Sequence, residues 1–468
     1  MTLHSADAAF AERLRARLSP RAFREDTTPY NREPRGAWQG RAELVVAPES
    51  TEEVSLVLAA ANEARVPVIP YGGGTGLVGG QIMPDGPAPL VLSLERMNRI
   101  REVDPQGNVI TAEAGVIVEE LQNAARGVDR LFPLSFGAHG SARLGGVLGT
   151  NAGGANVLRY GNTRELCLGL EAVLADGRIM RTLTGLRKDN TGYDLRNLLI
   201  GSEGTLGVIT AASFKIFPQP RDRAVALMVV SSPTAALELL ALTRDRVGDG
   251  VTAFELISGV GLDFLAETFP DRRRPFDPHP DWMVLVDLGL AADAGEIMEE
   301  IFAAGFEAEL VSDGLIAQNE AQAEDFWNLR EMIPEANREI GAISSHDISV
   351  PIATLPRFID EGMEAIAALG PYRLNCFGHL GDGNLHYNVF PPKGRKKAEF
   401  ADQKLAVMGV IHDLVVAHGG SISAEHGIGR LKAADLAKYG DPVKLELMRG
   451  IKQVFDPHGV LNPGAVLG

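Results

Sequence analysis

The chain has 468 residues, of which 45% are hydrophobic and 23% charged, a composition typical of globular proteins and not of disordered, collagen-like or coiled-coil chains. Its 61 acidic and 45 basic residues give a net charge of −16. This charge argues against a nucleic-acid partner but not against a small anion held by a few buried cations. Two cysteines, Cys167 and Cys376, exclude a disulfide framework and favour a reducing compartment.

The first residues contain no apolar segment typical of a secretory signal, and no apolar run in the sequence approaches the roughly 20 residues of a membrane span. Phe10, Leu14 and Leu18 recur every four residues, which predicts a short amphipathic helix packed on the body of the protein. We therefore expect a cytoplasmic protein, with attachment to a membrane surface as the alternative.

The first part of the chain alternates strand and helix patterns. Strands are expected at 43–48, 66–69, 90–97, 108–116, 169–175 and 178–184, with Asp176-Gly177 as a hairpin turn. Ser50 and Glu53 form a capping box that opens a helix, and a second helix is expected near Val118. The segment 218–220 (PQP) marks a domain boundary.

The pattern then changes to strands at 224–230, 252–258, 283–288 and 307–311, with helices at 233–247 and 295–304. Ser232-Pro233 supplies the start of the first of these helices. This order predicts an α+β domain with an antiparallel sheet. Further helices are expected at 403–418 and up to Phe455. We predict domains at 1–221, 222–410 and 411–468.

A first glycine-rich loop, 70–80, follows the strand at 66–69. Gly74, Gly76 and Gly79 satisfy G-x-G-x-x-G, but prolines at 84, 87 and 89 stand where the helix of a Rossmann motif would begin. A row of backbone N–H groups between two strands still suits a pyrophosphate. A flexible surface loop is the alternative.

Two further glycine-rich segments occur in the same region. Segment 145–154 has side chains too small for a core helix, and segment 202–207 precedes a strand that begins at Val208. Three such loops fit a long dinucleotide better than a single phosphate.

Six segments occur in the order of a known family: GGGTGLVGG, GGVLGTNAGGANVLRYGNTR, KDNTGYDLRNLLIGSEGTLGVIT, GHLGDGNLHYN, SAEHGIG and DPHGVLNP. From about residue 40 onward, the chain resembles the vanillyl-alcohol-oxidase-type FAD family. Within it, the chain is similar to the D-2-hydroxyacid dehydrogenase branch, which includes D-2-hydroxyglutarate dehydrogenase, cytochrome-type D-lactate dehydrogenase and the glycolate oxidase flavin subunit. The resemblance implies an α+β fold: a two-part FAD-binding domain, closed by C-terminal residues, with a ferredoxin-like antiparallel cap.

The resemblance also implies which residues contact FAD. These are Gly72, Gly73, Gly74, Thr75, Gly76, Gly79, Gly80, Pro133, Ser135, Gly140, Ser141, Gly145, Thr150, Asn151, Gly153, Gly154, Glu203, Gly204, Ile209 and Asn462. Some relatives attach the flavin through a histidine in the glycine loops. His139 is the only histidine in 132–154, and 70–80 has none, so we expect non-covalent FAD.

Five of the ten histidines lie between 379 and 426. A turn at 381–383 would join two strands and bring His379 and His386 together, and Glu425 follows in a later loop. Two imidazoles and a carboxylate are a common divalent-metal set, although buried histidines also form ordinary hydrogen bonds in a core. The resemblance implies that His379, His386 and Glu425 bind the metal, expected to be zinc with manganese as the alternative, and that His426 is the catalytic base. Asp382 is either a fourth ligand or a turn residue.

This set suits the oxidation of a 2-hydroxy acid. The metal would hold the hydroxyl and the carboxylate, His426 would take the hydroxyl proton, and FAD would accept a hydride. Asn388 is expected to orient the substrate, with strand packing as its alternative role. Electrons would then pass to a quinone, a cytochrome or an electron-transfer flavoprotein. The resemblance also implies a homodimer.

The resemblance matches Arg330 to the residue that binds the distal end of the substrate. The threonine and lysine that share this task in D-2-hydroxyglutarate dehydrogenases correspond to Pro334 and Ser345 here. His346 is the neighbouring group expected to replace the lysine in part. D-2-hydroxyglutarate, D-malate and D-lactate therefore all stay open as substrates, and a glycolate oxidase subunit, an oxygen-using alcohol oxidase and a flavin carrier are the alternative functions.

Overall fold

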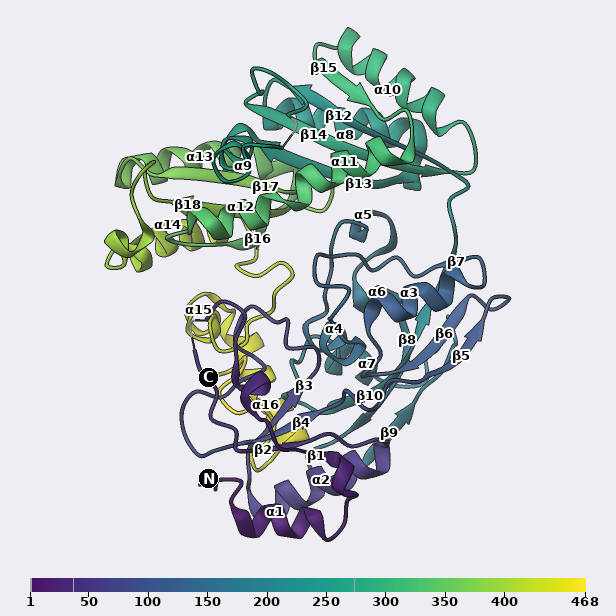
Figure 1. Cartoon of the computed structure of the whole chain (residues 1–468), viewed down its shortest axis with the longest axis vertical. Coiled ribbons are helices and arrows are strands. Elements are labelled where there is room, and N and C mark those ends of the chain that lie inside the picture. Colours follow the sequence, from purple (N-terminus) through teal and green to yellow (C-terminus); the bar gives the residue numbers. More distant parts are fainter. Residues whose placement is uncertain (1, 37, 273) are drawn as a thin grey trace. The chain divides into compact units, whose positions relative to one another are not determined.

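The computed structural model describes residues 2–36, 38–272 and 274–468, and the chain separates into two compact units (Figure 1). The first unit comprises the chain up to Gly153, Gly161–Gln219 and Glu425–Gly468. The second comprises Gly154–Tyr160 and Pro220–Ala424. It runs beyond residue 410 because α14 (Lys404–Ala417) packs on α13 (Leu355–Leu369), where His418 Nε2 lies 2.8 Å from Glu361 Oε2.

The first sheet of the first unit has the strand order β1-β2-β4-β3, and β2, β4 and β3 run parallel. Helix α2 begins where expected, because the Ser50 hydroxyl accepts the Glu53 N–H at 3.2 Å. Phe10 and Leu14 of α1 are buried in the core beside this sheet, which confirms that the N-terminal helix packs on the body. The bounds are α1 Ala8–Arg15, β1 Phe23–Arg24, β2 Leu44–Val46, α2 Thr51–Ala64, β3 Val68–Tyr71 and β4 Leu90–Ser93.

The second sheet of this unit is antiparallel, with the order β5-β6-β10-β8-β9, and β7 pairs separately with β11. No helix lies between β3 and β4, as the prolines there predict. The bounds are β5 Ile100–Asp104, β6 Val109–Glu113, α3 Val118–Arg126, β7 Arg130–Leu131, α4 Leu144–Thr150, α6 Thr163–Leu166, β8 Cys167–Val173, β9 Ile179–Thr182, α7 Leu195–Leu199, β10 Val208–Lys215 and β11 Phe217–Pro218.

Helix α4 is absent from the sequence prediction, which was wrong for 145–154. Leu144, Val147 and Leu148 follow the three-four spacing of an apolar helix face and are buried. The glycines between them let other backbone segments approach, since a Cβ on Gly145 would lie 3.0 Å from Ala114 Cβ. The helix therefore packs through its backbone.

The C-terminal segment completes the first unit. After α15 (Ala433–Tyr439) and α16 (Pro442–Phe455), Leu461 forms a parallel bridge with Val68 of β3. Val460 and Leu461 are fully buried in the same core as α2. Two chain ends thus share one core (Figure 1).

The second unit is built on an antiparallel seven-stranded sheet with the order β15-β12-β14-β13-β17-β18-β16. Helices α9, α11 and α12 cover one face, which carries Leu227, Ile257 and Phe377. Helices α8, α10 and α13 cover the other face. The bounds are α5 Val157–Tyr160, β12 Asp222–Val230, α8 Pro233–Val247, β13 Val251–Ser258, α9 Gly259–Thr268, β14 Trp282–Leu290, α10 Ala294–Glu307, β15 Val311–Ile316, α11 Glu320–Glu331, α12 Ile333–Ile340, β16 Asp347–Ser349, β17 Arg373–His379 and β18 Asn384–Phe390.

The strand predicted at 307–311 was misplaced. Helix α10 continues to Glu307, and Glu309 then takes a left-handed conformation, so that β15 begins only at Val311. Short 3₁₀ turns occupy Pro20–Ala22, Thr28–Asn31, Gly248–Gly250, Ile352–Thr354 and Lys397–Phe400. Cys167 and Cys376 are both buried and unbridged. Among the described residues, no helix combines the length and the apolar character that crossing a bilayer requires.

Candidate active site

The three glycine-rich loops predicted from the sequence meet in the first unit. The N–H of Glu203, in the third loop, donates to the Gly149 carbonyl of the second at 2.8 Å. A Cβ on Gly72, in the first loop, would lie 3.2 Å from Gly146 Cα, and a Cβ on Gly73 would lie 2.2 Å from the Ser141 oxygen. A side chain at Gly73 would clash with the Ser141 backbone, and one at Gly72 would press on Gly146. Such a cradle of closely packed backbone fits the pyrophosphate of a dinucleotide.

A buried polar network ties these loops to the segment that follows His426. The carboxylate of Glu203 accepts the N–H groups of Ile428 at 2.7 Å and Gly429 at 2.9 Å. Burial raises the pKa of Glu203, although these N–H groups and Arg430 oppose the rise. Glu203 was predicted as a flavin contact, and its carboxylate is engaged in holding the loop after the predicted base.

Arg430 belongs to the same network and was missed by the sequence analysis. Its guanidinium donates to the Gly79 oxygen at 3.0 Å, to Asn462 Oδ1 at 2.9 Å and to the Pro463 oxygen at 2.7 Å. Burial lowers its pKa to about 10. The available signal for Arg430 was its positive charge in a segment of glycines whose backbones pack against one another.

Asn462 completes the network. Its side-chain amide donates to the Gly80 oxygen at 2.9 Å and to the Glu203 oxygen at 2.8 Å. The residue is only 2% exposed, so all three hydrogen bonds are shielded from water. Asn462 thus joins the first and third glycine loops from the C-terminal end of the chain.

Some of the other predicted flavin contacts lie on these loops, and others lie on neighbouring segments. Asn151 ends α4 in a left-handed conformation, and its side chain accepts the Arg164 N–H at 2.9 Å. Gly154 falls within the second unit. Pro133, Ser135 and Gly140 lie between β7 and α4, Ile209 is buried in β10, and Gly153 is buried just before the second unit begins.

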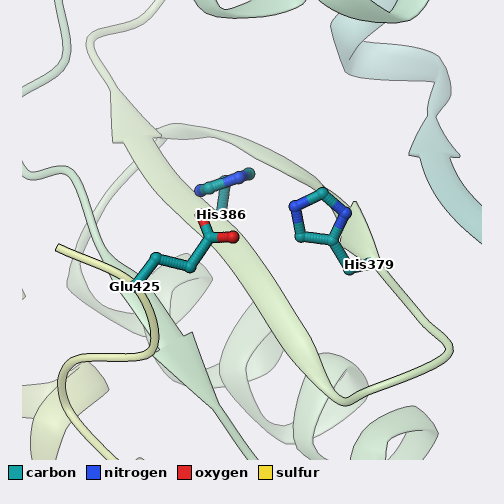
Figure 2. A group of neighbouring side chains, drawn as sticks. All are labelled: His379, His386 and Glu425. Atoms are coloured by element: carbon teal, nitrogen blue, oxygen red, sulfur yellow. The ribbon is translucent and has the colours of Figure 1, made fainter. Parts of the chain in front are cut away.

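The two histidines among the predicted metal ligands lie on the hairpin of β17 and β18 in the second unit (Figure 2). His379 ends β17, and His386 faces Phe377 in the register of the two strands. The turn predicted at 381–383 joins the strands, and the centroids of the two imidazole rings lie 5.9 Å apart. The two histidines, seven residues apart in the sequence, therefore lie close together across the hairpin.

The residue before Glu425 is hydrogen-bonded to the strand that pairs with this hairpin. The N–H of Ala424 donates to the Asp347 oxygen at 3.3 Å, and Asp347 pairs with His386 in the sheet. One ligand atom each from His379, His386 and Glu425 lies within 4.8 Å of the others, and Figure 2 shows the three side chains turned toward one another. Metal bonds of about 2.0–2.2 Å bring ligand atoms to about 3–4 Å of each other, so small rotations fit this set to a metal.

Asp382 behaves as a turn residue in the structure. Its carboxylate accepts the Asn384 N–H at 3.1 Å, the usual bond of an Asx turn. Burial raises its pKa. Asp382 is not a member of the cluster formed by His379, His386 and Glu425.

Glu255 is a buried carboxylate beside this cluster that the sequence analysis did not single out. It stands opposite His379 in the pairing of β13 with β17, and its Oε1 lies 2.5 Å from His379 Nδ1. Its Oε2 accepts the Nε–H of Arg330 at 2.8 Å. Burial would raise the pKa of Glu255, but His379 and Arg330 outweigh it and lower the pKa to about 2. The signal was a single charge in the apolar strand 251–258.

Arg330 lies at the end of α11, buried, with its guanidinium 5.2 Å from the ring centroid of Phe377. One turn earlier, Trp327 donates from its indole nitrogen to Asp287 of β14 at 2.8 Å. The segment that carries the predicted substrate arginine is thus fixed to the sheet by two buried carboxylates, Asp287 and Glu255.

The remaining predicted substrate residues are buried next to one another. Asn388 Oδ1 accepts the His346 N–H at 2.9 Å, and His346 Nε2 lies 2.8 Å from the Ser344 hydroxyl. Pro334 and Ser345, the two departures from the family pattern, are both exposed.

The glycine-loop unit and the antiparallel unit define the chain as a flavoenzyme of the vanillyl-alcohol-oxidase type, as the resemblance implied. The pattern "FAD binding domain" matches residues 42–183, and "FAD linked oxidases, C-terminal domain" matches residues 219–466. The chain belongs to this family of FAD-linked oxidoreductases.

Relatives and solved structures agree. The chain is 36% identical to a D-2-hydroxyglutarate dehydrogenase of Xanthomonas citri, covering 94% of this chain and 92% of that one. It is 35% identical to the mitochondrial D-2-hydroxyglutarate dehydrogenase of Arabidopsis thaliana, over 92% of this chain and 76% of that one. A D-2-hydroxyglutarate–pyruvate transhydrogenase of Saccharomyces cerevisiae is 30% identical, over 94% and 89%. The fold matches p-cresol methylhydroxylase with a TM-score of 0.76 at 17% identity, over 100% and 99% of the two chains.

Proposed function

We propose that the protein oxidises a D-2-hydroxy acid to the 2-oxo acid, with FAD bound at the glycine loops and a divalent metal, zinc by preference, bound by His379, His386 and Glu425. The observation that carries the proposal is the convergence of those three ligand atoms within 4.8 Å. The substrate named for the relatives supports the substrate class.

The charges of the ligand set and its neighbours suit an anionic substrate. Glu255 balances the charge of Arg330. Glu425 is the one carboxylate of the proposed ligand set. With a divalent cation, the set would carry a net positive charge and attract a carboxylate. Bound metal would lower the pKa of the substrate hydroxyl, and bound FAD would take the hydride from C2.

We propose His426 as the base that takes the hydroxyl proton, because the pKa of an unperturbed histidine, about 6.5, suits proton transfer near neutral pH. The network of Glu203 and Arg430 supports this role, since it restrains the residues that directly follow His426. A restrained backbone limits the positions that the imidazole samples, which favours a productive geometry.

The distal end of the substrate decides which D-2-hydroxy acid binds. A serine in place of the lysine found in D-2-hydroxyglutarate dehydrogenases would remove a charge-assisted hydrogen bond worth about 1.5–3 kcal/mol. We therefore propose that D-malate and D-lactate compete with D-2-hydroxyglutarate as substrates.

The test is an anaerobic titration of the purified yellow protein with each D-acid, with its L-enantiomer and with glycolate. Bleaching of the flavin band by one D-acid is the expected result. If no acid bleaches a sample that contains both metal and flavin, the substrate class is wrong. Bleaching by glycolate alone would favour the glycolate oxidase alternative, and peroxide formation in air would identify an oxidase.

Substitution His426→Ala separates the role of the base from flavin binding. We expect the variant to retain FAD, because the side chain is not among the predicted flavin contacts, and to lose flavin reduction by the substrate. The retained yellow colour is the control for folding. Normal reduction in this variant would contradict the assignment of His426.

A further inference from the structure

We propose that Glu255 is the positioning residue of this site: one carboxylate oxygen orients the His379 ring for the metal, and the other orients Arg330 for the substrate. The inference rests on the proposed function and extends it to a residue that the family resemblance did not implicate. The carrying observation is that both oxygens of one fully buried carboxylate are engaged, at 2.5 Å from His379 Nδ1 and 2.8 Å from Arg330 Nε.

The contact with His379 determines which ring nitrogen is available. An ionised carboxylate only accepts hydrogen bonds, so Nδ1 of His379 carries a proton. In a neutral ring, Nε2 then keeps its lone pair and is the atom that binds a metal. Carboxylates that accept from the second nitrogen of a metal-binding histidine fix the ring in this way and raise its basicity.

The contact with Arg330 acts on the other end of the site. Using Nε for Glu255 leaves the four N–H groups of the terminal nitrogens, enough for a bidentate contact with a carboxylate. The Phe377 ring on one side and the Trp327–Asp287 hydrogen bond one turn earlier restrict the guanidinium further. Glu255 thus holds a proposed metal ligand of β17 and a proposed substrate-binding arginine of α11 in a fixed relation.

Asp287 provides a matched control. It is a second buried carboxylate of the same sheet, 3% exposed, and it also anchors α11, through Trp327. It contacts Arg223 rather than a predicted metal ligand. Substitution Asp287→Asn is therefore expected to weaken the attachment of α11 to the sheet without touching His379.

The experiment compares the wild type, Glu255→Gln and Asp287→Asn, each purified with flavin bound and loaded with zinc. The zinc that each protein retains is measured against a series of chelator concentrations, and KM and kcat follow for the D-acid that bleaches the flavin. We expect Glu255→Gln to bind zinc about 10–100-fold more weakly and to show a raised KM. Asp287→Asn should lose thermal stability and keep the zinc affinity of the wild type.

Glu255→Asp is a second variant in case Glu255→Gln does not fold. It keeps the buried charge but shortens the side chain by one methylene, which moves the carboxylate away from its two partners. Its zinc affinity should lie between those of the wild type and Glu255→Gln. Wild-type zinc affinity in both Glu255 variants would overturn the inference and leave the proposed function intact. A wild-type protein that retains no zinc or manganese while yellow would overturn both.

Discussion

Arg330 and Glu255 illustrate how burial changes the energetic role of an ion pair. Their side chains are 9% and 0% exposed, whereas Arg338 and Glu335, which also pair, are 72% and 44% exposed. An exposed pair contributes about 0–1 kcal/mol because water and salt screen it. Removing one partner of a buried pair leaves an uncompensated charge, which costs about 3–5 kcal/mol.

We therefore expect Arg330→Gln to lower the free energy of unfolding by about 3–5 kcal/mol. Arg338→Gln, the same change at the exposed pair, should lower it by less than about 1 kcal/mol. Urea unfolding of both variants at neutral pH, followed by tryptophan fluorescence, measures the difference. Equal effects would show that the buried pair is not the stabilising element assigned here.

The residues of the site differ in how visible they are in the sequence. His379, His386 and Glu425 stand in short segments with a family pattern. The structure brings one ligand atom of each within 4.8 Å of the others, and their binding of a metal stays a prediction. Glu255 lies 124 residues before His379 and meets it only through the register of β13 and β17. No local spacing encodes that meeting, although a charge in an apolar strand marks a residue that needs a partner.

At the scale of elements, the hairpin of β17 and β18 depends on its turn. Gly383 has φ +83°, and a Cβ there would lie 2.3 Å from the Val350 oxygen. Gly394 has a similar φ of +81°, but a Cβ there would meet nothing within 4 Å. The two glycines thus separate the cost of backbone conformation from the cost of a clash.

Substitution Gly394→Ala should cost about 1–2 kcal/mol of stability, the price of a left-handed alanine. Gly383→Ala should cost more, because the turn must also move away from Val350. Since that turn sets the distance between His379 and His386, Gly383→Ala should also weaken zinc retention, and Gly394→Ala should not. Thermal unfolding and zinc analysis of the two variants provide the comparison.

Helix α4, which the sequence analysis did not predict, shows that apolar periodicity alone does not reveal tertiary packing. Three apolar positions were enough to make α4 a helix, while the glycine content of the segment suggested a loop. Glycine there serves close packing against Ala114 and Gly72, a tertiary cause that no single segment reveals. Apart from the strand at 307–311, the other strands and helices that were predicted lie where apolar patterns and caps place them, as Ser50 and Ser232 illustrate. Several short strands and helices, among them α9, α12 and β16, were not predicted.

At the scale of the whole molecule, the first unit is assembled from three separate stretches of chain. Its last stretch supplies a bridge to β3 through Leu461, buried core residues, and two side chains, Arg430 and Asn462, that bond the glycine loops. The arrangement of glycine loops that we propose as the flavin cradle is therefore complete only when the C-terminal segment has docked. Glycine spacing predicted the cradle, but the polar groups that hold it come from a region more than 200 residues later.

Asn462 is the position where this dependence is tested most directly. Substitution Asn462→Ala leaves the Glu203 carbonyl without its donor, at about 1–3 kcal/mol for a buried unpaired group, and leaves the Gly80 carbonyl only the longer bond from Arg430 at 3.3 Å. Asn31→Ala is the matched control: Asn31 is also a buried asparagine with three hydrogen bonds in this unit, made to Thr27 and Ala42 away from the glycine loops. Both variants should unfold at lower temperature, but only Asn462→Ala should release FAD more readily, as measured by flavin fluorescence on dilution. Equal flavin affinity in the two variants would mean that the C-terminal segment stabilises the unit without shaping the cradle.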